Sequence, residues 1–336
     1  MPVLYAATGD DVVRLRSTTG TRWEADTILT DVGAQCLAVD PHAPERIYVG
    51  TFDRGLFWTA NAGRDWTHAG PGIPHSRVLS VAVSPSRRGR AGGAVFAGTE
   101  PSALYRSDDG GASWTELAGL RNLPSAPTWS FPPRPSTSHV RWIGLSWSDP
   151  DLVFAAVELG GVMRSVDGGI TWEDRKPGSY HDAHTVLVHP RDPAYIYEAA
   201  GGGAAVSRDG GATWSPVDDG LDRRYVWAVA ADPDDPELWY VSASPSAQHA
   251  HHSAKGDADA AIYRRRGIRP WEALAGGLPN PLPAMPYALV APIERPGELY
   301  AGLRSGAVFH GTDHGTTWHA LDLTLPGLLA LVWAGE

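Results

Sequence analysis

The sequence contains a single cysteine, Cys36, and no long hydrophobic run. One thiol cannot form an internal disulfide, so the disulfide framework typical of small secreted domains is excluded. The longest apolar stretch, residues 325–333, is much shorter than the about 20 residues that cross a bilayer as a helix. The first residues also lack a basic segment followed by an apolar run, which is the pattern of a secretion signal. We therefore expect a cytoplasmic protein that does not enter a membrane.

Positive charge is also scarce. The chain has 28 Lys and Arg residues against 38 Asp and Glu residues, which gives a formal net charge of -10. Nucleic acids and anionic membrane surfaces are bound by basic surfaces, so neither is an expected partner. What the sequence does contain in quantity is Gly (38), Pro (28) and Trp (14). This composition is typical of many short strands joined by tight turns.

Tryptophan recurs along the whole chain with a regular spacing. Seven Trp residues lie about 40 to 60 residues apart, which is the length of one four-stranded propeller blade with its loops. They are Trp23, Trp66, Trp114, Trp172, Trp214, Trp271 and Trp318. A repeat of this length predicts a β-propeller with one such Trp in each blade.

Three of these Trp residues end a complete S-x-D-x-G-x-x-W motif, at residues 107–114, 165–172 and 207–214, and the other four end partial copies. In this motif the Asp accepts backbone N–H bonds within its own turn, and the Gly supplies a left-handed backbone position. The motif resembles the Asp-box repeat of the BNR superfamily, and the resemblance extends over the whole chain. It implies that each copy forms the turn between the third and fourth strands of a blade, away from the ligand-binding face. We therefore assign these aspartates a structural role.

Short apolar segments upstream of the motifs supply the other strands. Innermost strands are expected at 35–41, 79–85, 143–150, 184–190, 227–233 and 287–292, and a seventh, 328–335, has no blade after it. The first blade lacks an innermost strand, so residues 328–335 are expected to pair with residues 3–8 and close the ring. The sequence thus predicts an all-β fold, a single seven-bladed propeller of four-stranded antiparallel blades over residues 1–336. Cys36 falls within an innermost strand without a neighbouring base, which indicates a buried structural thiol.

The loops before the innermost strands and after the second strands reach one face of such a ring, around the mouth of its channel. These loops carry His and Arg at matched positions, and focused positive charge raises the local concentration of anions. We expect this face to bind a small anionic molecule, for example a sugar acid. The expected binding residues are His75, Arg77, His139, Arg141, Arg224 and Arg304.

The same loops offer groups that hold a divalent metal ion. The expected ligands are His181, His184, Glu158, His249 and His251, with Asp182 beside them. The polar segment 244–261, which also contains His252 and Lys255, is expected to form a lid or a docking loop, and the Pro- and Ser-rich segment 119–138 to form another rim loop. The alternative for all of these residues is that they only solvate an exposed face.

The resemblance does not select one function, because the superfamily includes sialidases, other glycosyl hydrolases, sortilin-type receptor domains and photosystem assembly factors. Sialidases have six blades and an Arg-Ile-Pro motif near the start, whereas Arg46-Ile47 is followed here by Tyr48. Sialidase activity is therefore not expected. Xyloglucan hydrolases of this superfamily need a cleft between two propellers, and only one propeller is predicted.

Two hypotheses remain. The first is an enzyme or small-molecule binder that acts on an anionic or metal-chelating ligand, such as a metal-dependent lyase or hydrolase. Its catalytic candidates are His181, His184, Glu158 and Tyr225. The second is a non-catalytic scaffold that presents its rim to a protein partner. Ionisable residues at matched positions in successive repeats favour the first hypothesis.

Overall fold

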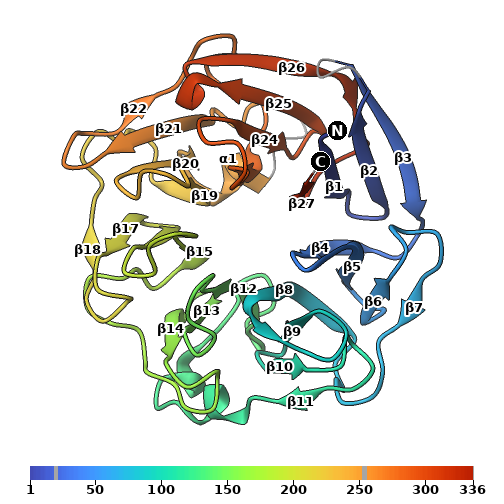
Figure 1. Cartoon of the computed structure of the whole chain (residues 1–336). Coiled ribbons are helices and arrows are strands. Elements are labelled where there is room, and N and C mark those ends of the chain that lie inside the picture. Colours follow the sequence, from blue (N-terminus) through green and yellow to red (C-terminus); the bar gives the residue numbers. More distant parts are fainter. Residues whose placement is uncertain (19–21, 252–255, 336) are drawn as a thin grey trace.

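The computed structural model describes residues 1–18, 22–251 and 256–335, which form a ring of seven β-sheets (Figure 1). His252 and Lys255 lie outside the described residues. Each sheet is one blade, and its antiparallel strands follow one another from the centre of the ring outward. The all-β propeller expected from the sequence is confirmed.

The strands of the first four blades are as follows. The first blade contains β27 (Ala330–Gly335), β1 (Val3–Ala7), β2 (Val12–Ser17) and β3 (Trp23–Leu29); the second contains β4 (Ala34–Asp40), β5 (Ala43–Thr51), β6 (Leu56–Thr59) and β7 (Thr67–His68); the third contains β8 (Arg77–Arg88), β9 (Gly93–Glu100), β10 (Leu104–Ser107) and β11 (Thr115–Glu116); and the fourth contains β12 (Val140–Leu145), β13 (Val153–Val157) and β14 (Gly161–Ser165). In the described part of the fourth blade, an isolated bridge between Arg164 and Glu173 takes the place of a fourth strand.

The other three blades and the helices complete the ring. The fifth blade contains β15 (Ala183–Val188), β16 (Ile196–Ala200), β17 (Gly203–Ser207) and β18 (Ser215–Pro216); the sixth contains β19 (Tyr225–Ala231), β20 (Leu238–Ser244), β21 (Ala261–Arg266) and β22 (Glu272–Ala273); and the seventh contains β23 (Pro286–Val290), β24 (Leu299–Leu303), β25 (Ala307–Thr312) and β26 (Thr317–Thr324). The helical segments are η1 (Ala118–Asn122), η2 (Ala126–Thr128), η3 (Asp313–Gly315) and α1 (Ala247–His251).

The two ends of the chain meet in the first blade and close the ring. Strand β27 pairs with β1, with Leu4 opposite Trp333 and Ala7 opposite Ala330. The innermost strands contact one another in the order β27, β4, β8, β12, β15, β19, β23 and back to β27. The predicted pairing of residues 328–335 with residues 3–8 is confirmed, and it leaves no open edge between the first and last blades.

The repeated motifs form turns between the third and fourth strands, as expected. In the third blade the Ser107 hydroxyl accepts a hydrogen bond from the Gly111 N–H at 2.8 Å, and Asp109 accepts one from the Ser113 N–H at 2.9 Å. The same bonds recur around Asp167 and Asp209. Because the hydrogen-bonding capacity of each carboxylate is used within its own turn, these aspartates hold the blade edge together.

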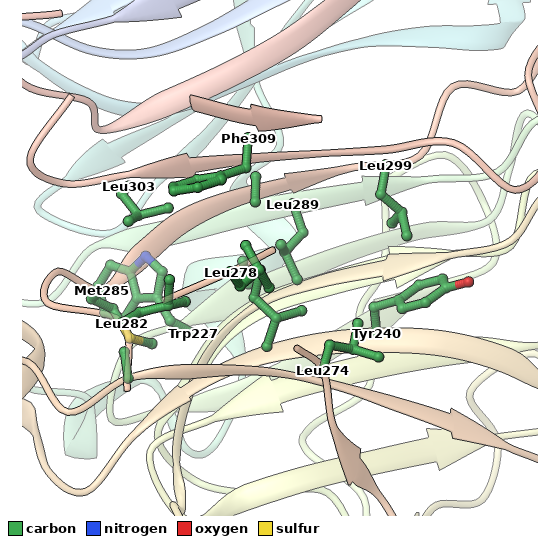
Figure 2. Close-up of a cluster of buried hydrophobic side chains, with 14 of the residues drawn as sticks. Trp227, Tyr240, Leu274, Leu278, Leu282, Met285, Leu289, Leu299, Leu303 and Phe309 are labelled. Atoms are coloured by element: carbon green, nitrogen blue, oxygen red, sulfur yellow. The ribbon is translucent and has the colours of Figure 1, made fainter. Parts of the chain in front are cut away.

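Hydrophobic clusters between adjacent blades form the core. Figure 2 shows the cluster between the sixth and seventh blades, in which Trp227, Tyr240 and Leu274 belong to one buried group with Leu299, Leu303 and Phe309 of the next blade. Such burial contributes about 25 cal/mol for each Å² of apolar surface removed from water.

No helix among the described residues is long and apolar enough to cross a membrane.

Polar side chains link several adjacent blades near the channel, from the innermost strands β4, β8 and β15 and from the second strand β20 of the sixth blade. The Ser80 hydroxyl donates to the Val140 carbonyl at 2.8 Å, the Thr185 hydroxyl to the Trp227 carbonyl at 2.7 Å, and the Ser242 hydroxyl to the Pro286 carbonyl at 2.8 Å. The Cys36 thiol makes the corresponding long contact to the Val78 carbonyl, at 3.7 Å. Burial raises the pKa of Cys36 to about 12, so this thiol stays protonated and packs between blades.

Candidate functional site

A β-bulge recurs near the start of six innermost strands: β4, β8, β12, β15, β19 and β23. At each bulge one residue of the innermost strand, or two residues in β19, has no paired residue on the second strand. These residues are Gln35, Leu79, Arg141, His184, Trp227 with Ala228, and Tyr287. A bulge twists the strand and redirects a side chain. We call the end of the ring where these strands begin the mouth face.

Four of the bulge residues, with Arg304, form one connected group that we call the mouth cluster: Arg141, His184, Trp227, Tyr287 and Arg304. The Arg141 guanidinium lies 4.5 Å from the Trp227 ring centre. The Trp227 ring centre is 4.5 Å from that of His184 and 5.1 Å from that of Tyr287. The Arg304 guanidinium lies 5.6 Å from the Tyr287 ring.

The arginines near the mouth face differ in how their charge is compensated. Arg77 donates to Glu100 at 2.7 Å, and the exposed Arg224 lies 3.4 Å from Asp218. In contrast, neither Arg141 nor Arg304 has a carboxylate at ion-pair distance among the residues that the structure describes. Both are partly exposed and rest on aromatic rings, which attract the cation without neutralising it.

A chain of carboxylates and a histidine runs beside the mouth cluster. His139 is buried, and its Nε2 donates to Glu158 at 3.0 Å, while its Nδ1 lies 3.9 Å from Glu100. Glu100 is itself held by Arg77 and by both ends of the Arg134 guanidinium. Burial would raise the pKa of Glu158, but the hydrogen bond and charge of His139, with the charge of Arg141, outweigh burial and lower the pKa. Glu158 is therefore an anion at neutral pH.

Glu158, Asp182 and His184 form a second group on the mouth face. Each offers one ligand atom, and these atoms lie within 4.8 Å of one another. His184 Nδ1 lies 2.7 Å from the Val226 carbonyl, which can only accept, so this nitrogen donates. His184 Nε2 is buried without a hydrogen-bond partner and lies 3.6 Å from the Asp182 carboxylate.

Tyr225 and His251 lie next to the mouth cluster and are bound to each other. Helix α1 places His251 between two tyrosines, with Nε2 2.7 Å from the Tyr225 hydroxyl and Nδ1 2.5 Å from the Tyr287 hydroxyl. Burial lowers the pKa of His251 to about 4. Burial raises the pKa of Tyr225, which stays protonated. Both ring nitrogens of His251 are thus engaged, and His251 is not part of the Glu158–Asp182–His184 group.

The remaining residues nominated from the sequence lie outside these groups. His181 is exposed, and His249 is exposed and hydrogen-bonded to Ser246. His75 lines a separate pocket of about 360 Å³ with residues 53–56, 68–70, 73, 74 and 76, and its ring packs against Tyr105. The structure therefore brings together only part of the nominated set: Arg77, His139, Arg141, Glu158, Asp182, His184, Tyr225, His251 and Arg304.

Sequence reasoning did not nominate Trp227, Tyr287 or Arg134. The two aromatic residues begin the segments expected as innermost strands, 227–233 and 287–292, and Figure 2 shows Trp227 within the cluster between the sixth and seventh blades. One signal was available: both residues align with His184 at the first position of the repeated segments. Arg134 gave no such signal, because it lies in the Pro-rich segment between the third and fourth blades.

The other end of the channel has a different character. A pocket of about 450 Å³ lies where the innermost strands end, lined by Trp147, Trp333, Leu145 and several prolines. Trp147 is exposed, and Trp333 donates to Glu294 at 3.1 Å. Asp40 and Glu294 also line this pocket, whose lining among the described residues includes carboxylates but no arginine, lysine or histidine.

No protein-family model matches this sequence, and no curated protein matches it. Solved structures share the fold. An ancestral GH74 enzyme superposes with a TM-score of 0.63 at 19% identity over 89% of this chain, and this chain spans only 38% of that one. YCF48 bound to D1 peptide gives a TM-score of 0.56 at 17% identity, with 85% of this chain and 82% of that chain covered. The RRP9 WD40 repeats give a TM-score of 0.61 at 13% identity, with 98% of this chain and 88% of that chain covered. At these identities the similarity shows a seven-bladed propeller fold, which enzymes and protein-binding proteins share.

Proposed function

We propose that this chain binds a small anionic molecule at its mouth face, through Arg141 and Arg304. The observation that carries the proposal is the pair of guanidinium groups without a carboxylate partner in the described part of the chain, in a protein whose net charge is -10. A planar guanidinium offers paired N–H donors that match a carboxylate, sulfate or phosphate. Trp227 and Tyr287 hold these donors against apolar surfaces, where charge-assisted hydrogen bonds are stronger than in water.

The aromatic surface narrows the class of ligand. An anion with an apolar or sugar-like face gains both the guanidinium contacts and packing against the partly exposed ring of Tyr287. A sugar acid combines these properties. The ionisation states support binding more than proton transfer, since Glu158 and Tyr225 both have pKa values shifted away from neutrality, in opposite directions.

The proposal is tested by calorimetric titration of the protein, in buffer containing EDTA, with glucuronate, phosphate and sulfate. We expect saturable binding of glucuronate that Arg141→Ala and Arg304→Ala each weaken about 10- to 100-fold, equivalent to about 1.5–3 kcal/mol for a charge-assisted hydrogen bond. Arg269→Ala, an exposed arginine in the turn between β21 and β22, is the matched control and should leave binding unchanged. Equal weakening by all three variants, or no binding by any probe, would reject the proposal.

A second candidate is the binding of an extended peptide at the same face. It is favoured by the similarity to YCF48, whose structure holds the D1 peptide. A peptide with a free terminal carboxylate would use the same arginines. The two candidates separate in competition: glucuronate should displace a labelled peptide if they share Arg141, whereas a peptide that contacts only the outer rim would remain bound.

A further inference from the structure

We infer that Glu158, Asp182 and His184 form a binding site for one divalent transition-metal ion, such as Zn²⁺ or Mn²⁺. The three ligand atoms come from two neighbouring blades: Glu158 follows β13, Asp182 precedes β15, and His184 is the bulge residue of β15. The inference does not depend on the anion site, because neither Arg141 nor Arg304 is a ligand.

The first argument is the state of the His184 ring. Its Nδ1–H is fixed by the Val226 carbonyl, so in the neutral ring the lone pair is on Nε2. That atom is completely buried and has no hydrogen-bond partner, although an unpaired buried polar atom destabilises a fold. A histidine that donates one nitrogen to a backbone carbonyl and presents the other is the arrangement found at metal centres.

The second argument is the position of the two carboxylates. Asp182 Oδ2 lies 3.6 Å from His184 Nε2, and all three donor atoms lie within 4.8 Å of one another. Ligands at about 2.1 Å from a tetrahedral ion are separated by about 3.4 Å, so small rotations of the carboxylates complete the geometry. Two carboxylate oxygens with one imidazole nitrogen suit Zn²⁺, Mn²⁺ or Fe²⁺ better than Mg²⁺ or Ca²⁺, which prefer oxygen ligands alone.

The third argument is the support around the ligands. Glu158 accepts a hydrogen bond from His139 at 3.0 Å, which leaves its second oxygen available. Asp182 has no arginine or lysine at ion-pair distance within the described ranges. His184 packs against Tyr225 and Trp227, which fixes the ring plane. Three ligands from the protein leave positions for water or for an anionic ligand.

The test uses the full-length, untagged protein, freed of metal with EDTA and then dialysed. Calorimetric titration with ZnCl₂ and with MnCl₂ should show one equivalent of at least one ion, and that ion should raise the melting temperature. Asp182→Asn and Glu158→Gln preserve shape but remove a charged ligand, and each should weaken binding at least tenfold. His181→Ala and His249→Ala are the matched controls, since both remove exposed histidines from the same face and should change nothing.

Circular dichroism and the metal-free melting temperature show whether each variant is folded. A folded Asp182→Asn or Glu158→Gln protein that binds the ion as tightly as the unmodified chain would overturn the inference. The inference would also be overturned if neither ion were taken up stoichiometrically. It would be overturned as well if His181→Ala lost as much affinity for the ion as Asp182→Asn.

Discussion

Arg141 lies over the indole ring of Trp227, 4.5 Å from its centre, although the strands that carry them are not neighbours in the ring. The blade of β15 separates β12 from β19, so the Arg141 side chain reaches past a whole blade. Both residues are unpaired at a β-bulge, which turns them out of their own sheets. The mouth cluster is therefore a product of the ring as a whole rather than of any one blade.

This contact gives the first prediction. Replacing Trp227 with Leu keeps an apolar side chain but removes the ring under Arg141, so the guanidinium loses its support. We expect the affinity for glucuronate to fall about 3- to 30-fold, corresponding to about 0.5–2 kcal/mol for a cation–π contact. Calorimetry measures the change. The control is Trp58→Leu, which removes an equivalent contact in the second blade, where the Arg46 guanidinium lies 4.8 Å from the Trp58 ring centre. This variant should bind glucuronate with unaltered affinity. A similar loss of affinity in Trp58→Leu would show that the effect of Trp227→Leu is not local.

The sequence predicted the framework of this region but not the contacts within it. His184, Trp227 and Tyr287 align at the start of the repeated segments, so the period of the repeat placed them at one end of the ring. The sequence could not show that a bulge follows each of these strand starts, because the extra residue is visible only in the pairing register. It also could not show that Arg141 crosses a blade, since that distance depends on the curvature of the closed ring.

Histidines were the least predictable residues. His181 and His184 are three residues apart and were nominated together, but the strand begins at Ala183, so one ring is exposed and the other is completely buried. On α1, His249 is exposed whereas His251 is partly buried between two tyrosines. Spacing alone gives residue types within reach of one another, whereas the local backbone decides which side chain turns inward.

The second prediction concerns ring closure. Leu331 in β27 is buried against the first and seventh blades, opposite Ala6. Leu331→Ala should lower the free energy of unfolding by about 2–4 kcal/mol, the usual cost of removing a buried leucine side chain, and thus lower the urea midpoint. Ile268→Ala removes a side chain that is 93% exposed and should change the midpoint little. Equal effects of the two substitutions would show that closure by β27 does not stabilise the ring.

The third prediction concerns Glu198, a completely buried carboxyl group in β16. Burial raises its pKa to about 8, although the Tyr180 N–H and the Ser179 hydroxyl donate to it. Between its ordinary pKa of 4.5 and about 8, the folded protein holds a proton that the unfolded chain has released, so stability from this group is lost as pH rises.

Glu198→Gln cannot ionise, and the Ser179 hydroxyl can rotate to accept from the new amide. The variant should therefore gain stability relative to the unmodified protein as pH rises from 5 to 8, by at most about 1.4 kcal/mol per pH unit. Urea unfolding at several pH values measures the difference between the two proteins. A difference that stays constant over this range would mean that Glu198 is already ionised in the fold.

The last prediction concerns His251, whose titration has the opposite sign. The folded protein keeps this ring neutral down to a pKa of about 4, because it is buried near His184 and held between Tyr225 and Tyr287, whereas the ordinary value is 6.5. Between pH 6.5 and 4 the unfolded chain takes up a proton that the folded protein does not, so stability falls as the solution is acidified.

His251→Gln removes the titrating group while retaining a side chain that can donate to one tyrosine and accept from the other. At pH 7 the variant should be less stable than the unmodified protein, because it loses the packing of the neutral His251 ring. Its stability should nevertheless fall less steeply between pH 6.5 and 4. His249→Gln, two residues away on the exposed side of α1, should keep the slope of the unmodified protein. Urea unfolding at half-unit pH intervals gives the slopes. If His251→Gln retains the full acid sensitivity, another group is responsible for it, and His251 is able to take up a proton within the fold.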